Sequence, residues 1–126
     1  MTNSQALHTA ILIVEDEALL RMDARDFLEE AGYAVHEAAN ADEAIKILEA
    51  NDEIRLVFTD VNMPGSMDGV KLAHFVHRRW PPTKIIVASG HDKIGEDALP
   101  GGVAFFRKPY RAMQILSKMR DLLQAA

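Results

Sequence analysis

The chain alternates between short runs of apolar residues and longer stretches in which apolar residues recur every three or four positions. The continuous runs predict buried strands, and the spaced positions predict helices that bury one face. The predicted strands are Ala10–Val14, Tyr33–Ala39, Leu56–Thr59, Lys84–Ala88 and Val103–Phe106. The predicted helices are Ala18–Ala31, a helix from Asn40 to about Ala50, a helix that opens at Asp68-Gly69 and stops at Pro81-Pro82, and Pro109–Leu123.

Local signals mark several of the helix ends. Gly32 follows the first predicted helix and is a plausible stop for it. Asn40 and Glu43 have the spacing of a capping box, with Asn in the cap position. Pro109 suits the first turn of the last helix, because this turn does not need its N–H groups.

Strands that alternate with helices predict a parallel sheet covered by helices on both faces. Right-handed crossovers and a doubly wound strand order of 2-1-3-4-5 give an α/β fold of the flavodoxin type. One domain accounts for residues 10–126, preceded by a flexible lead-in over residues 1–9. The chain therefore has the length and the pattern of a single α/β domain.

Composition excludes several classes of protein. The 126 residues include no cysteine, so neither a disulfide framework nor thiolate chemistry is available. No apolar run is long enough to span a membrane, and the first residues lack the pattern of a signal peptide, so the expected compartment is the cytoplasm. The net charge of −5 comes with no broad cluster of Lys and Arg, which argues against direct nucleic-acid binding.

The end of the second predicted strand carries only the capping residue Asn40, but the other four strand ends carry polar residues that could take part in a reaction. They are Glu15 and Asp16, then Asp60, Ser89 and Lys108. A doubly wound sheet brings these strand ends together at one edge, where ligands bind. Two carboxylates about 4 Å apart repel by roughly 4 kcal/mol at an effective dielectric constant of 20, and Mg²⁺ held by oxygen ligands would remove that cost. A carboxylate, a hard cation, an ammonium group and a hydroxyl together predict phosphoryl transfer.

Four segments, ILIVEDE, FTDVNMPG, VASG and FFRKPY, occur in this order and span most of the chain. With these segments the chain resembles the receiver domains of two-component response regulators. The resemblance implies a signalling module, not an enzyme in the usual sense, since it would catalyse only its own phosphorylation and dephosphorylation. It also implies a sensor histidine kinase or a histidine phosphotransfer protein as phosphoryl donor, and a downstream protein partner. A homodimer is a further candidate partner, whereas nucleic acid and membrane are not expected to bind directly.

The resemblance assigns the acidic residues to phosphoryl acceptance and Mg²⁺ binding. It implies that Asp60 is the phosphoacceptor and that Asp16 binds Mg²⁺ directly, with Glu15 acting through water. Asp60 itself and the backbone carbonyl of Asn62 would complete the protein's share of the metal ligands.

The resemblance also assigns roles to residues of the fourth and fifth strand ends. Ser89 would bond the phosphoryl group and Lys108 would be its ion-pair partner. Phe105 would be an aromatic switch residue, and the Lys108–Pro109 bond would be cis so that the lysine faces the acceptor.

Two segments depart from the family pattern. The loop MPGSMDG carries one residue more than usual, and the stretch from Ser89 to Lys108 is shorter than usual. Within it, His91–Gly102 contains three glycines and a proline, which disfavour a helix by about 1 and 3 kcal/mol each. We therefore expect a short or irregular fourth helix there, which phosphorylation could order.

Other interpretations of the same residues remain. A phosphatase or phosphotransferase of the haloacid-dehalogenase type would need a second Asp where Asn62 stands. A degenerate receiver is opposed by the presence of Asp16, Asp60, Ser89 and Lys108. A calcium loop starting at Asp60 fails because its twelfth position is Lys71. Whether the chain is a stand-alone receiver or part of a larger protein stays open.

Overall fold

A parallel sheet of five strands in the order β2-β1-β3-β4-β5 forms the centre of the molecule. The structure, a computed structural model, describes residues 9–90 and 98–124. The strands are β1 (Ala10–Val14), β2 (Ala34–Ala38), β3 (Ile54–Asp60), β4 (Lys84–Ser89) and β5 (Ala104–Arg107). The helices in these residues are α2 (Ala18–Glu30), α3 (Ala41–Ala50), α4 (Gly69–Arg79) and α5 (Ala112–Gln124). The predicted fold class and strand order are confirmed.

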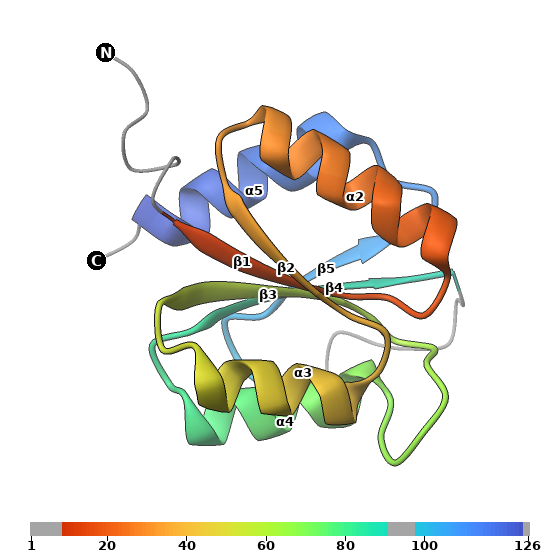
Figure 1. Ribbon diagram of the computed structural model, residues 1–126, viewed down its shortest axis with the longest axis vertical. Coiled ribbons are helices and arrows are strands. Elements are labelled where there is room, and N and C mark those ends of the chain that lie inside the picture. The colour runs from red at the N-terminus through yellow and green to blue at the C-terminus, as the bar shows by residue number, and fades with distance from the viewer. Residues whose placement is uncertain (1–8, 91–97, 125–126) are drawn as a thin grey trace.

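Helices cover both faces of the sheet, with α2 and α5 on one face and α3 and α4 on the other (Figure 1). Alternate residues of β1 accordingly enter two separate cores. Ile11 and Ile13 pack with α2 and α5, whereas Leu12 and Val14 pack with α3 and α4. Burial on both faces is the reason why β1 appears in the sequence as an unbroken apolar run.

Several element boundaries differ from the prediction by one to three residues. Strand β3 begins at Ile54, because Arg55 is exposed and interrupts the apolar run without interrupting the strand. Strand β5 begins at Ala104, since Val103 still belongs to a turn in which its N–H bonds the carbonyl of Pro100 at 3.3 Å. The predicted start of the last helix at Pro109 was wrong, because α5 begins at Ala112.

The first turn of α5 explains its late start. The side chain of Gln114 accepts a hydrogen bond from the N–H of Arg111 at 3.2 Å. The carbonyl of Arg111 in turn accepts from the N–H groups of Gln114 and Ile115. Arg111 therefore acts as the capping residue, and residues 108–110 lie outside the helix.

Side chains cap α3 and α4 as the sequence indicates. Asn40 accepts from the N–H of Glu43 at 2.9 Å, and Glu43 reaches back to the N–H of Ala39 at 2.8 Å, so the box closes one residue before the cap. Asp68 accepts from the N–H of Lys71 at 3.0 Å. Gly32, with φ of 99°, ends α2 in the left-handed conformation that glycine adopts readily.

The predicted lead-in and most of the predicted irregular segment, His91–Gly102, lie outside the described residues. At the end of that segment, Leu99 is buried, and the His74 Nε2 atom on α4 lies 2.7 Å from the carbonyl oxygen of Ala98. In the part of the chain that the structure describes, no helix combines the length and the apolar character needed to cross a membrane.

Candidate functional site

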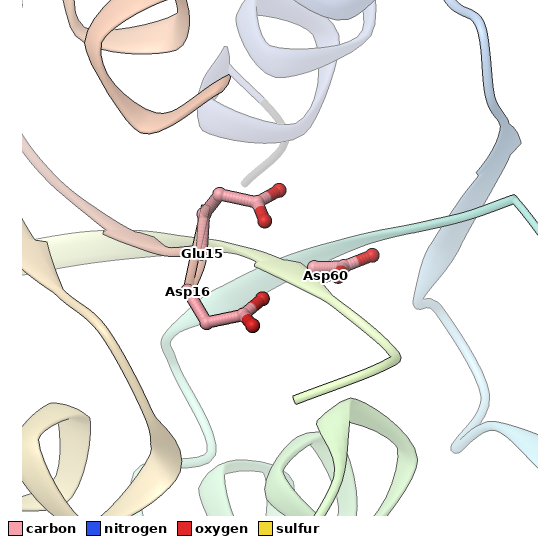
Figure 2. A group of neighbouring side chains, drawn as sticks. All are labelled: Glu15, Asp16 and Asp60. Carbon is pink, nitrogen blue, oxygen red and sulfur yellow. The ribbon is translucent and has the colours of Figure 1, made fainter. Parts of the chain in front are cut away.

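Three carboxylates meet at the carboxyl edge of the sheet, where β1 and β3 lie side by side. Glu15 and Asp16 follow β1, and Asp60 is the last residue of β3. One carboxylate oxygen from each residue lies within 4.8 Å of the other two. Figure 2 shows the three carboxylates around the same space, as the strand order predicts for residues 15, 16 and 60.

Lys108 lies between two of these carboxylates. Its Nζ atom is 3.2 Å from Oε1 of Glu15 and 3.1 Å from Oδ1 of Asp60. The contact with Glu15 is a hydrogen bond across the sheet that the sequence did not indicate. Lys108 is itself held by a hydrogen bond from its N–H to the carbonyl of Ser89 at 2.8 Å. The ammonium group therefore offsets part of the negative charge at the site.

Burial dominates the ionisation of the two inner carboxylates. It raises the pKa of Asp60 above the ordinary value of 3.8, and Lys108 offsets only part of that effect. Burial likewise raises the pKa of Glu15 above 4.5, although a hydrogen bond from the N–H of Glu17 opposes the rise. Burial lowers the pKa of Lys108, but Asp60 and Glu15 outweigh it, and the net pKa is raised above 10.5.

The site has the donor set of a hard divalent cation. All three acidic groups offer oxygen, which Mg²⁺ prefers to nitrogen or sulfur. Oδ1 of Asp60 is buried and, although it lies close to Lys108, receives no aligned hydrogen bond from the described residues. An inward-facing carboxylate oxygen with this unmet bonding capacity fits a metal ligand or a covalent acceptor.

The structure also describes the remaining predicted residues. Ser89 is fully buried at the end of β4. Asn62 is exposed, two residues beyond the end of β3. Phe105, on β5, is partly buried and packs against the core that lies between the sheet and helices α3 and α4. The peptide bond between Lys108 and Pro109 is cis, as predicted.

Sequence reasoning missed two residues that brace the site. Tyr110 follows Lys108 and Pro109 in the chain and packs its ring edge-on against Phe58 of β3, with centroids 5.6 Å apart. Arg21 of α2 donates from Nη1 to the carbonyl of Glu15 at 2.8 Å. A cation near the start of a helix opposes the helix dipole, and this unfavourable placement was the available signal for Arg21.

The start of α4 touches the backbone of Asp60. The N–H of Gly69 donates to the carbonyl of Val61 at 2.8 Å. A Cβ atom at Gly69 would collide with the carbonyl oxygen of Asp60, so only glycine fits there. The first residue of α4 thus packs against the end of β3 and bonds the residue that follows it.

Comparison with known proteins places this geometry in context. The sequence model of the family described as response regulator receiver domain matches residues 11–120. The chain is 36% identical over 121 residues to the sensor kinase CckA of Brucella abortus, covering 90% of this chain and 12% of that protein. It is 34% identical over 125 residues to the transcriptional regulatory protein ResD of Bacillus subtilis, covering 97% of this chain and 51% of that protein. The chain thus spans about half or less of the length of these two relatives.

Solved structures show the same likeness. A response regulator receiver protein from Sinorhizobium medicae superposes with a TM-score of 0.86 at 27% identity, covering 93% of this chain and 95% of that one. The receiver domain of the hybrid histidine kinase CckA superposes with a TM-score of 0.76 at 33% identity, covering 91% of this chain and 99% of that one.

Proposed function

The chain belongs to the response regulator receiver domain family of two-component signalling, and we propose that it accepts a phosphoryl group on Asp60 from a phosphohistidine of a partner protein. The observation that carries the proposal is the buried Asp60 oxygen, 3.1 Å from Lys108 and inside a cluster of three carboxylates. In this proposal residues 10–126 form the receiver domain and the protein acts in the cytoplasm.

The proposed transfer is a displacement at phosphorus. A carboxylate oxygen of Asp60 attacks the phosphorus atom, an O–P bond forms, and the P–N bond to the donor imidazole breaks with its electron pair returning to nitrogen. Lys108 favours the ionised form of Asp60 and so offsets part of the effect of burial on its pKa, and a carboxylate with a raised pKa is the better nucleophile once ionised. The hydroxyl of Ser89 and the ammonium of Lys108 would then bind the transferred phosphoryl group.

Mg²⁺ is the proposed cofactor, held by Asp16, Asp60 and the backbone carbonyl of Asn62, with Glu15 acting through water. When bound, it would neutralise the charge that develops on the phosphoryl oxygens.

Phe105 is the proposed switch residue, whose rearrangement would report phosphorylation to a downstream protein.

The donor protein is proposed to dock beside the acceptor on an exposed apolar rim. Among the described residues, the large apolar side chains left exposed are Leu19, Leu20, Met22 and Met113. They lie near the starts of α2 and α5. Helix α2 begins two residues after Asp16, and α5 begins four residues after Lys108. In this proposal the partner covers these side chains as it brings a phosphohistidine to Asp60, and burying such side chains stabilises a complex.

Two phosphoryl donors test the acceptor and the rim separately. Intact mass after incubation with acetyl phosphate and Mg²⁺ should show one added phosphoryl group, absent in Asp60→Asn and in EDTA. Undiminished labelling of Asp60→Asn would refute the acceptor assignment, and no labelling of the parent by any donor would indicate a degenerate receiver.

Leu19→Ser with Met113→Ser should slow transfer from a phosphorylated donor protein but leave the acetyl phosphate reaction unchanged.

A further inference from the structure

We propose that Arg21 is a positioning residue for the metal site, because it fixes the peptide group that aims Asp16. The inference rests on the proposed function, in which Asp16 binds Mg²⁺. Nη1 of Arg21 donates to the carbonyl oxygen of Glu15 at 2.8 Å. This carbonyl belongs to the peptide bond between Glu15 and Asp16, so the hydrogen bond fixes the plane from which the Asp16 side chain departs.

Asp16 has no other means of orientation in the part of the chain that the structure describes. Its side chain is exposed and takes part in no hydrogen bond or ion pair with the described residues. An unrestrained carboxylate loses conformational entropy when it binds a metal, so a fixed backbone beneath it favours binding.

The other polar groups of Glu15 are already bound. Its N–H donates to the carbonyl of Ala38 at 3.0 Å. Its carboxylate accepts from Lys108 at 3.2 Å and from the N–H of Glu17 at 3.2 Å. The bond from Arg21 therefore completes the restraint of Glu15, and its loss would free the one peptide group that leads directly to Asp16.

Arg21 is in turn held by strand β2. Its Nε atom donates to Oε1 of Glu37 at 3.2 Å, while Oε2 of Glu37 accepts from Nη1 of Arg25 at 2.6 Å. Side chains on a helix lean toward its N-terminus, which directs the guanidinium of Arg21 over the loop that precedes α2. The planar guanidinium binds Glu37 and the Glu15 carbonyl at once, which an ammonium group cannot do with the same geometry.

Simple electrostatics predicts the opposite effect of removing Arg21. A positive charge near a cation site repels the cation, so its loss should strengthen Mg²⁺ binding if charge alone matters. Positioning predicts that Mg²⁺ binding weakens. The sign of the change therefore separates the two explanations without reference to phosphorylation activity.

The experiment is a Mg²⁺ titration of the full chain followed by NMR at the backbone amide of Asp16, at constant ionic strength. Arg21→Gln should bind Mg²⁺ about tenfold more weakly than the parent, a typical effect of removing a group that orients a ligand. Arg21→Lys should fall between the two. Arg25→Gln is the matched control, because it removes the same charge and a bond to Glu37 but no bond to Glu15, and its Kd should stay within about twofold of the parent.

Binding by Arg21→Gln that is as tight as in the parent, or tighter, would overturn the inference, as would an equal loss in Arg25→Gln. If Arg21→Gln does not fold, Arg21→Lys against Arg25→Gln decides in the same way. A parent that binds no Mg²⁺ would refute the proposed metal site instead. In that case the Asp16 amide shift of the metal-free proteins decides, and a shift unchanged in Arg21→Gln would overturn the positioning role.

Discussion

Asp60 is a charged residue in a place that favours its neutral form. It is 7% exposed, and its raised pKa shows that Lys108 does not fully compensate the loss of hydration. Glu15, also 7% exposed, is in the same condition. Such destabilising charges are typical of functional sites, where reactivity takes precedence over stability.

Asp60→Asn should therefore stabilise the metal-free protein, and the gain should depend on pH. The folded state binds a proton at Asp60 more readily than the unfolded state between pH 3.8 and the raised pKa. The contribution of Asp60 to the free energy of unfolding thus falls as the pH rises through that window and stays low above it. Urea unfolding in EDTA should show a gain on the order of 1 kcal/mol for Asp60→Asn at neutral pH, shrinking toward pH 4. A gain that is constant with pH would contradict this account.

A second residue-scale prediction concerns the contact between Gly69 and the backbone of Asp60. Gly69→Ala should lower the free energy of unfolding by about 2 kcal/mol, since the added methyl group would meet the Asp60 carbonyl, a backbone group that cannot rotate away. Gly101→Ala is the matched control, because a Cβ there would meet no atom within 4 Å. Equal stability of the two variants in urea would show that the end of β3 yields easily.

At the scale of elements, the helix that follows Asp60 along the chain is held at both ends by local contacts. Asp68 caps α4 at its start, and the N–H of Trp80 bonds the carbonyl of Val76 at 2.8 Å at its end. In the loop before α4, the hydroxyl of Ser66 donates to Asp42 of α3 at 2.7 Å, which ties the longer loop to the neighbouring helix.

Asp68→Ala should lower the free energy of unfolding by about 1 kcal/mol, the usual effect of losing an N-cap. Asp68→Asn should stay within a few tenths of a kcal/mol of the parent, because Asn caps nearly as well as Asp. Thermal or urea unfolding measures both variants. A loss in Asp68→Asn as large as in Asp68→Ala would point to the charge of Asp68, not its cap, as the stabilising feature.

The elements themselves were predictable because each has a strong local pattern. β1 is an unbroken apolar run and β4 has an apolar centre, while Asn40 and Asp68 are typical capping residues at the starts of their helices. Arg111 carries no such signal, since Arg is not a usual capping residue and its role depends on the side chain of Gln114. The start of α5 was therefore placed too early.

The site was predictable only as far as strand ends determine it. Strand order alone brings residues 15, 16 and 60 together, and it needs no knowledge of side-chain direction. The bond between Lys108 and Glu15 and the bond from Arg21 depend on rotamers and on packing between α2 and the sheet. No spacing in the sequence expresses these, because each joins elements whose relative placement is a property of the folded chain.

At the scale of the whole molecule, the metal-free protein carries its least favourable charges together at one edge of the sheet. Mg²⁺ should stabilise it as RT ln(1 + [L]/Kd), about 2.7 kcal/mol at a hundredfold excess over Kd. Asp16→Ala should remove most of this response, whereas Asp52→Ala, at an exposed position outside the cluster, should retain it. Thermal unfolding with and without Mg²⁺ measures the response, and a melting temperature of the parent that ignores millimolar Mg²⁺ would count against a metal site.

The ion pair between the first and last strand ends has a consequence for the chain as it is synthesised. Glu15 and Lys108 are 93 positions apart, and β1 lies inside the sheet while β5 lies at its edge. A nascent chain therefore exposes its acidic groups from the ribosome long before their only described ammonium partner has been made. A product of premature termination before residue 108 would hold Asp60 without its lysine, so under the proposed function such a copy would lack the ammonium group that binds the transferred phosphoryl group.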